Sequence, residues 1–245
     1  MAAGVAPSSF VSNLLEESNL TAHEEHVIKW SAASLYSGGA DTTVSAIYSF
    51  FLAMILYPEV QKKAQAEIDA VVGSNRLPTL ADRAFLPYVE ALAKEVVRWH
   101  VVAPLTFQHV AMEDGIHNGY LIPKGSCVLA NIWGILHDKE TYKEPHLFKP
   151  ERFLGDHPEL DPRTVSFGYG RRICPGIQLA DSSVFISCAM SLAVFNMTKW
   201  VENGVEITPS AEDLPGTILH PALFKCTITL RSPEAEALVL ETPEY

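Results

Sequence analysis

One cysteine, Cys174, lies in a stretch whose composition suits metal chemistry, residues 167–176. The stretch contains three glycines and two adjacent arginines, and it leads into an apolar segment, 177–195, with the pattern of a buried helix. Glycines allow the backbone to approach a flat group, while arginines and a helix N-terminus favour a thiolate over a thiol. The stretch therefore predicts an anionic sulfur ligand. The alternative is that Cys174 is a small buried hydrophobic residue, which would need neither glycines nor cations.

The longest predicted element is a helix over 21–57, which begins with a capping-box pattern at Thr21 and Glu24 and ends before a proline. Its middle contains the run Gly38-Gly39-Ala40-Asp41-Thr42-Thr43, where two glycines lower helix stability by about 1 kcal/mol each. Two missing Cβ atoms let a helix lie against a cofactor, and Thr42 can bond a carbonyl one turn back. A kinked packing contact with a satisfied polar pair is the alternative.

A third pattern lies in a helix predicted over 87–99, where Glu95 and Arg98 are neighbours on one face. Such a pair is usually exposed and contributes a few tenths of a kcal/mol. The pair becomes significant together with a downstream segment that supplies a second arginine, Phe148-Lys149-Pro150-Glu151-Arg152-Phe153.

Five residues match all five fixed positions of the pattern Phe-x-x-Gly-x-Arg-x-Cys-x-Gly: Phe167, Gly170, Arg172, Cys174 and Gly176. This pattern resembles the haem-binding loop of the cytochrome P450 family. The resemblance implies that Cys174 is the proximal thiolate ligand of a haem b iron, a ligand type that favours O–O cleavage. It also implies that Arg172 pairs with a haem propionate and that Phe167 packs near the sulfur.

The other patterns are similar to the same family. The run at 38–43 resembles its oxygen-binding groove, which implies that Gly38 and Gly39 lie against the cofactor and that Asp41 and Thr42 deliver protons. The family implies a buried triad of Glu95, Arg98 and Arg152 that holds the loops below the haem. His109 would meet a propionate, with a surface histidine as the alternative. Residues 101–107 and 216–219 would lie near the substrate.

The expected fold is mainly α with small β-sheets (α+β), and by resemblance a P450 fold that is truncated at its N-terminal side. Further helices are predicted over 58–72 and 177–195, and strands over 105–110, 116–122 around Asn118-Gly119, 126–132 and within 196–231. Residues 1–20 are expected to be weakly structured and 21–231 to form the C-terminal part of a haem domain. The acidic tail, 232–245, is predicted to be loose.

The composition is that of a globular chain, with 48% hydrophobic residues and a net charge of −11. This acidity argues against a nucleic-acid partner. Four scattered cysteines fit neither a disulfide framework nor a zinc cluster, and motifs of P-loop, zinc-peptidase, serine-hydrolase and dinucleotide-binding proteins are absent from the sequence. The N-terminus shows no signal or anchor pattern, and Asp41 argues against a membrane span through the long apolar helix.

By resemblance, the expected function is that of a haem-thiolate monooxygenase of fungal microsomal type in secondary metabolism. It would insert one atom of O2 into a small apolar substrate with electrons from an NADPH-cytochrome P450 reductase. The family implies the endoplasmic reticulum membrane, with the anchor in an N-terminal half that is missing here. The alternative is a truncated, non-catalytic product that binds haem weakly or serves only as an interaction module.

Overall fold

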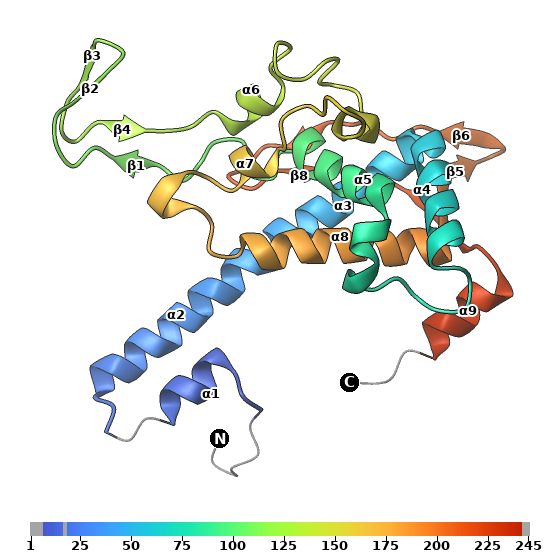
Figure 1. The fold of residues 1–245 in the computed structure, drawn as a ribbon, viewed down its shortest axis with the longest axis horizontal. Helices are drawn as coiled ribbons and strands as arrows, with labels where there is room; N and C mark the ends of the chain where they lie inside the picture. The colour runs from blue at the N-terminus through green and yellow to red at the C-terminus, as the bar shows by residue number, and fades with distance from the viewer. Residues whose placement is uncertain (1–6, 17–18, 242–245) are drawn as a thin grey trace. The chain divides into compact units, whose positions relative to one another are not determined.

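The computed structural model describes residues 7–16 and 19–241 (Figure 1). The chain divides into two compact units, Met1–Thr42 and Thr43–Tyr245, and each is described by itself. Residues 1–6 and 17–18 of the predicted N-terminal segment, and 242–245 of the predicted tail, lie outside the described residues. The domain limits expected at residues 20 and 231 stay predictions.

The first unit contains the helices α1 (Phe10–Leu15) and α2 (Ala22–Ala40). The predicted capping box begins α2, because the Glu24 N–H donates to Thr21 Oγ1 (3.2 Å) and the Thr21 N–H donates to a Glu24 carboxylate oxygen (2.7 Å). Asp41 interrupts the helix predicted over 21–57, since α2 ends at Ala40 and the next helix begins at Thr42. Glycines and a back-bonding threonine weaken a helix at such a point.

The second unit consists mainly of helices, with four small sheets among its described residues. The helical elements that follow α2 are α3 (Thr42–Leu56), α4 (Pro58–Val71), η1 (Leu80–Phe85), α5 (Pro87–Trp99), α6 (Ile132–Leu136), η2 (Pro150–Phe153), α7 (Arg163–Ser166), η3 (Gly170–Arg172), α8 (Ile177–Val194) and α9 (Pro233–Leu240).

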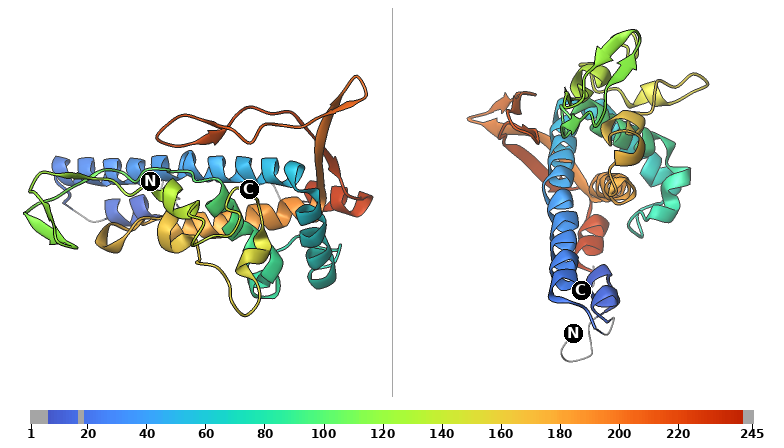
Figure 2. Two further views of the ribbon diagram at one scale, coloured as in Figure 1. Left: turned by 90° about the horizontal axis from the view of Figure 1, so that it is seen from above. Right: turned by 90° about the vertical axis from the view of Figure 1, so that its left-hand side faces the viewer.

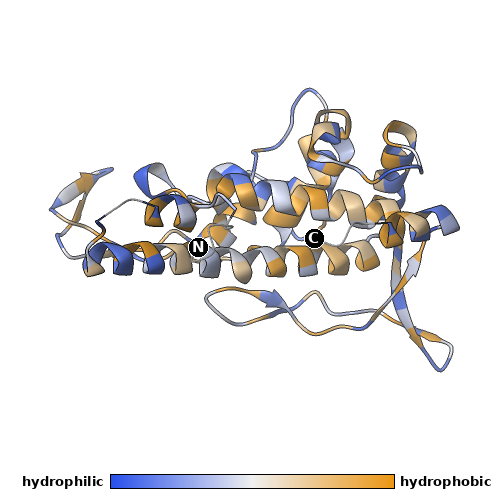
Figure 3. Cartoon of the chain, turned by 90° about the horizontal axis from the view of Figure 1, so that it is seen from below, coloured by the Kyte–Doolittle hydropathy of each residue, from blue (hydrophilic) through white to orange (hydrophobic). Residues whose placement is uncertain are grey.

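The core of this unit lies between α3, α4, α5 and α8 (Figure 2), and apolar residues predominate along α3 (Figure 3). Phe50 of α3, Ile68 of α4, Leu92 of α5 and Phe185 of α8 are all completely buried there. A second buried cluster includes Ala91 of α5, with Leu136, Tyr142 and Phe153. The helix α5 therefore contributes to both apolar clusters and is the central support of the unit.

Within residues 7–16 and 19–241, two helical segments have the length and apolar composition of a membrane span, 22–56 (α2 and α3 together) and 177–194. The second of these is α8, which packs into the core described above. Core helices of globular proteins meet the same criterion, so this observation is weak evidence of a membrane span.

All strands pair in antiparallel fashion, in the order β1-β4, β2-β3, β6-β5-β9 and β7-β8. Their bounds are β1 (His109–Val110), β2 (Gly115–His117), β3 (Tyr120–Ile122), β4 (Cys127–Val128), β5 (Phe195–Glu202), β6 (Val205–Ile207), β7 (Asp213–Leu214), β8 (His220–Pro221) and β9 (Cys226–Leu230). The β2–β3 turn has positive φ at Asn118 (48°) and Gly119 (82°), as expected of an Asn-Gly hairpin.

Two glutamines of α4 bond to the backbone of β5. The Gln61 side chain accepts from the Met197 N–H (2.8 Å) and donates to the Met197 carbonyl (2.9 Å). The Gln65 side chain, one turn further along, donates to the carbonyl of Phe195 (3.0 Å). The helix thus supplies amide groups to the strand as a neighbouring strand would.

The structure differs from the sequence prediction at two further places. The strand predicted over 126–132 is short, and Ile132 instead begins α6, which Asn131 caps through its bond from the Gly134 N–H (2.9 Å). The tail predicted to be loose contains α9, which packs on α8 and buries Ala235. Ser232 and Pro233 are a cap and a first helical residue that explain this helix.

Candidate cofactor-binding site

The stretch 167–176 forms a tight loop between α7 and α8. The Cys174 N–H donates to the Phe167 carbonyl (2.8 Å), and the Ile173 N–H donates to the Gly170 carbonyl (3.3 Å) across η3. Gly168 (φ 80°) and Gly170 (φ 58°) adopt left-handed conformations that side chains rarely permit. The loop therefore folds back so that Cys174 returns to its beginning at Phe167.

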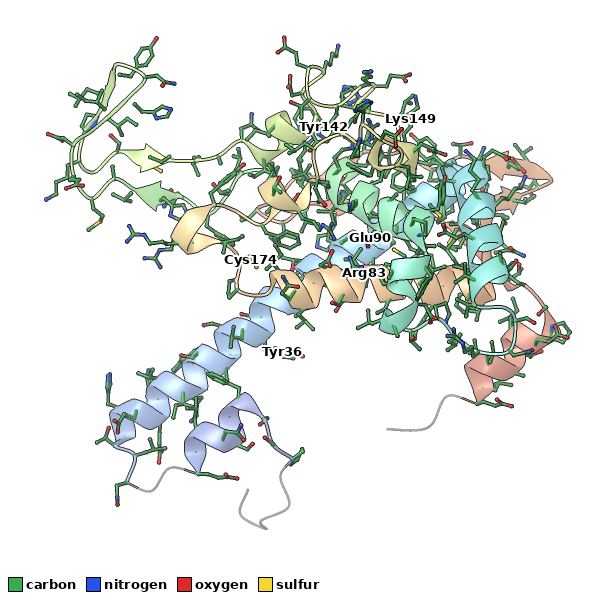
Figure 4. All side chains as sticks on the ribbon, viewed as in Figure 1. Tyr36, Arg83, Glu90, Tyr142, Lys149 and Cys174 are labelled. Carbon is green, nitrogen blue, oxygen red and sulfur yellow. The ribbon has the colours of Figure 1, made fainter. Side chains whose placement is uncertain are left out.

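Cys174 differs from the other three cysteines in its surroundings. It is partly exposed, unpaired, and two residues before Gly176, the N-cap of the 18-residue α8 (Figure 4). The sulfur therefore lies just before the N-terminus of this helix, and Arg171 and Arg172 are exposed beside it. By contrast, burial raises the pKa of the Cys188 thiol, which therefore stays protonated in the core.

The predicted pairing of Glu95, Arg98 and Arg152 is present and buried. Arg98 donates to both carboxylate oxygens of Glu95 (2.8 and 2.9 Å), and Arg152 donates to the same carboxylate (3.1 Å). The relative exposures are 0% for Glu95 and Arg98 and 8% for Arg152. We call these three residues the buried triad.

The buried triad also binds the backbone of the segment that follows α6. Arg98 donates to the carbonyls of Leu136 (3.0 Å) and Leu147 (3.2 Å), and the Lys149 N–H donates to Glu95 (2.8 Å). Burial raises the pKa of the Glu95 carboxyl, while hydrogen bonds and attraction from the arginines act in the opposite direction. The triad therefore holds an irregular segment against α5 through charge-assisted bonds.

A second set of charges, which the sequence patterns did not predict, includes one residue before the Cys174 loop and one after it. Arg83, Glu90, Arg163 and Asp181 form a closed ring of alternating charge, which we call the ion-pair ring; Figure 4 labels Arg83 and Glu90. Its members come from η1, α5, α7 and α8. No local spacing connects them, so only the tertiary fold reveals the ring.

The sequence patterns also did not predict the contacts of a buried histidine, His100. His100 Nδ1 lies 3.0 Å from a carboxylate oxygen of Asp213, and its Nε2 lies 2.8 Å from the Ser45 hydroxyl oxygen. Ser45 is fully buried and also bonds the Leu219 carbonyl. These contacts connect α3, the end of α5 and the β7–β8 hairpin, and they place the 216–219 segment within the second unit.

The residues predicted to handle protons belong to the first unit. The Thr42 hydroxyl donates to the Gly38 carbonyl at 2.9 Å, which is the bond one turn back that the sequence predicts. A Cβ added at Gly38 or Gly39 would meet no other atom within 4 Å. The roles of these residues and of Asp41 stay predictions.

His109 lies in β1, where its ring is exposed and its backbone pairs with Val128. This placement fits the surface alternative as well as a contact with a propionate. Its predicted role therefore stays a prediction.

A sequence model of the family described as Cytochrome P450 matches residues 5–228. The chain belongs to the cytochrome P450 family. The predicted family is therefore confirmed, while the roles of the residues in the Cys174 loop stay predictions.

The chain is similar to several fungal P450 proteins. The chain is 59% identical to cytochrome P450 monooxygenase 208 of Postia placenta, over 98% of this chain and 47% of the relative. It is 53% identical to cytochrome P450 monooxygenase claR of Ampulloclitocybe clavipes (98% and 45%) and 43% identical to O-methylsterigmatocystin oxidoreductase of Aspergillus flavus (98% and 46%). The chain thus spans about half the length of the curated relatives it matches.

Solved P450 structures confirm the predicted fold class. A zebrafish cytochrome P450 with abiraterone matches with a TM-score of 0.81 and 32% identity, over 94% of this chain and 56% of that chain. A zebrafish structure with progesterone matches with a TM-score of 0.79 and 32% identity (92% and 52%). The chain therefore has a mainly helical P450 fold with small sheets.

The P450 family implies a haem group, and the loop around Cys174 fits one. A porphyrin would bring four nitrogen ligands of its own, so one further donor from the protein would hold the iron, and the Cys174 sulfur would be that donor. Among the residues that the structure describes, no group of three or more His, Cys, Asp and Glu side chains could hold a bare metal ion. A Cβ added at Gly170 would meet no atom within 4 Å, so a flat group can approach the backbone there.

Proposed function

We propose that the chain acts in haem-dependent monooxygenation, in which one atom of O2 enters a small apolar organic substrate and the other leaves as water. Two electrons and two protons balance this reaction. The observation that supports the proposal most directly is the Cys174 sulfur on a folded glycine turn before α8. A bound haem b would supply the iron that activates O2.

In this proposal the residues of the second unit bind and orient the cofactor. Cys174 provides the thiolate, whose charge the dipole of α8 stabilises. Arg172 and His109 pair with the propionates, and Phe167 packs near the sulfur, where its carbonyl already accepts the Cys174 N–H. The buried triad holds the segment 136–152 against α5.

Residues of the first unit handle protons. Gly38 and Gly39 leave space on one face of α2, and the Thr42 hydroxyl donates to the Gly38 carbonyl. A hydroxyl that donates to the backbone keeps its oxygen lone pairs free, so Thr42 can also accept a hydrogen bond. Asp41 would exchange protons with water. Both residues are proposed to deliver protons.

The electrons are proposed to come from an NADPH-cytochrome P450 reductase, because the family implies a redox partner. We also propose an endoplasmic reticulum location and a role in secondary metabolism. The proposed metabolic role is supported by the fungal relatives, one of which is named O-methylsterigmatocystin oxidoreductase.

The test is the absorption spectrum of the 245-residue chain supplied with haem, reduced and exposed to carbon monoxide. The variants are Cys174→Ala and the matched control Cys127→Ala, which removes an exposed cysteine of β4. We expect a red-shifted Soret band that disappears in Cys174→Ala and persists in Cys127→Ala.

Absence of bound haem, or a band that survives in Cys174→Ala, would contradict the proposal. Either result would favour the alternative that the chain has the P450 motifs without their chemistry. If the band is present, NADPH oxidation with an added reductase then tests for turnover.

A further inference from the structure

The two ends of the Cys174 loop are joined by an ion pair. Arg163 is the first residue of α7, before the loop, and Asp181 lies in α8, after it. The Arg163 guanidinium donates to the Asp181 carboxylate at 2.9 Å. The residues 167–176 are therefore enclosed in a loop that this contact closes.

The same contact belongs to the ion-pair ring, which connects the loop to the rest of the unit. Arg163 also donates to Glu90 of α5 (2.9 Å), and Arg83 of η1 donates to the other oxygen of Glu90 (2.8 Å). Arg83 completes the ring at Asp181 (2.6 Å). Each member of the ring therefore has two partners of opposite charge.

Further contacts restrain the side chains of the two arginines in the ion-pair ring. The Arg83 guanidinium lies 4.8 Å from the ring centroid of Phe185, a fully buried residue of α8. Asp161 accepts two bonds from Arg163 (2.9 and 2.5 Å) and pairs with Lys94 of α5 (3.2 Å). These contacts restrict the side chains of the ring before any ligand is present.

The burial and charge of the ring suit a structural rather than a surface role. The side chains of its four members are 20–24% exposed, so solvent screens them less than an ordinary surface pair. Two arginines balance two carboxylates, so the ring adds no net charge beside Cys174. Its contribution is therefore geometric.

We propose that Arg83, Glu90, Arg163 and Asp181 are positioning residues that fix the Cys174 loop in its ligand-presenting shape before the cofactor binds. The proposal rests on the proposed function, in which Cys174 is the axial ligand. A ligand held in its bound geometry loses less conformational entropy on binding, and this preorganisation favours cofactor affinity.

The test uses the full chain without added haem and measures the rate at which iodoacetamide modifies each cysteine, read by mass spectrometry. The variants are Arg163→Gln and Asp181→Asn. The control is Asp69→Asn, which breaks the ion pair between Asp69 of α4 and Arg231 at 2.5 Å. Exposed Cys127 reports reagent activity, and buried Cys188 reports global unfolding.

We expect Cys174 modification to be about fivefold faster or more in both ring variants, the factor for roughly 1 kcal/mol of lost local order. Cys127 and Cys188 should react at unchanged rates, and Asp69→Asn should change none of them. Amide hydrogen exchange of residues 167–176 should accelerate in the same two variants.

Three results would overturn the proposal. The first is an unchanged Cys174 rate in both variants. The second is a parallel rise of Cys188, which would mean general destabilisation. The third is an opposite change in the two variants, which a purely electrostatic effect on the thiol predicts because one variant removes a cation and the other an anion.

If Arg163→Gln fails to fold by circular dichroism, Asp181→Asn with hydrogen exchange decides, because exchange does not depend on the thiol. Absence of the haem spectrum in the unchanged chain would overturn the proposed function alone. The labelling result would still show whether the ring positions the loop.

Discussion

The helix α5 supports two polar networks that differ in how their charges are satisfied. The buried triad places the Glu95 carboxylate between two guanidinium groups, whose other donors bind backbone carbonyls of the segment 136–152 and, from Arg152, the Glu159 carboxylate (2.6 Å). The ion-pair ring alternates two cations and two anions that are 20–24% exposed. Among the described residues, Arg98 therefore has Glu95 as its one carboxylate partner, whereas each ring member keeps a second partner of opposite charge and access to water.

This difference predicts the largest loss of stability for Glu95→Gln. The variant leaves the fully buried Arg98 without its carboxylate, while Arg152 keeps Glu159, and removing one partner of a buried ion pair lowers the free energy of unfolding by about 3–5 kcal/mol. Urea unfolding followed by circular dichroism measures the change. The matched control is Glu59→Gln, which breaks an exposed pair with Lys62 and should not shift the midpoint. A loss in Glu95→Gln as small as in the control would show that the triad is not structural.

A smaller loss is expected for Arg98→Lys, because the variant keeps a positive charge but loses the bidentate geometry. An ammonium group cannot reach Glu95, Leu136 and Leu147 together, and a hydrogen bond to a charged group contributes about 1.5–3 kcal/mol. Urea unfolding should place this variant between the wild type and Glu95→Gln. Stability equal to that of the wild type would mean that charge, and not geometry, defines the triad.

The ion-pair ring should give a loss of about 1 kcal/mol in Asp181→Asn, and the loss should depend on salt. Arg83 and Arg163 keep Glu90 as a partner in this variant. Urea unfolding at low and at high sodium chloride concentration should show that the loss shrinks with salt for Asp181→Asn but not for Glu95→Gln. Equal salt dependence of both variants would contradict the distinction between the two networks.

The smallest effect concerns pH. Burial raises the pKa of Asp161, but hydrogen bonds from Arg163 lower it further, to about 2, against an ordinary value of 3.8. The folded state therefore binds fewer protons than the unfolded state, so the contribution of Asp161 is present above about pH 4 and is lost as the pH falls through 2. The difference in unfolding midpoint between the wild type and Asp161→Asn should be present at pH 6 and smaller at pH 3. A larger difference in unfolding midpoint at pH 3 than at pH 6 would contradict the lowered pKa of Asp161.

The sequence predicts the features that depend on local spacing. The capping box of Thr21 and Glu24, the Asn118-Gly119 hairpin and the fold of the Cys174 loop all rest on residues within a few positions of one another. The buried triad was predicted only through the family resemblance, because Arg152 is remote from Glu95 along the chain.

The ion-pair ring and the contacts of His100 could not be predicted in this way. Arg83, Glu90, Arg163 and Asp181 lie on four elements, and their meeting depends on how those elements pack. His100 likewise meets Ser45 and Asp213, each remote in the sequence. The helix α9, in contrast, had a local signal in Ser232 and Pro233 that the acidic composition of the tail obscured.

The glutamine contacts of α4 have a consequence for solubility. A strand edge with unpaired amide and carbonyl groups can recruit a strand from another molecule and begin aggregation. Along β5, the backbone groups of Met197 and the carbonyl of Phe195 are already bonded to Gln61 and Gln65, while β9 pairs with the same stretch of β5. In the folded chain, two side chains of a helix thus occupy these backbone groups and close this stretch of the edge to intermolecular β-pairing.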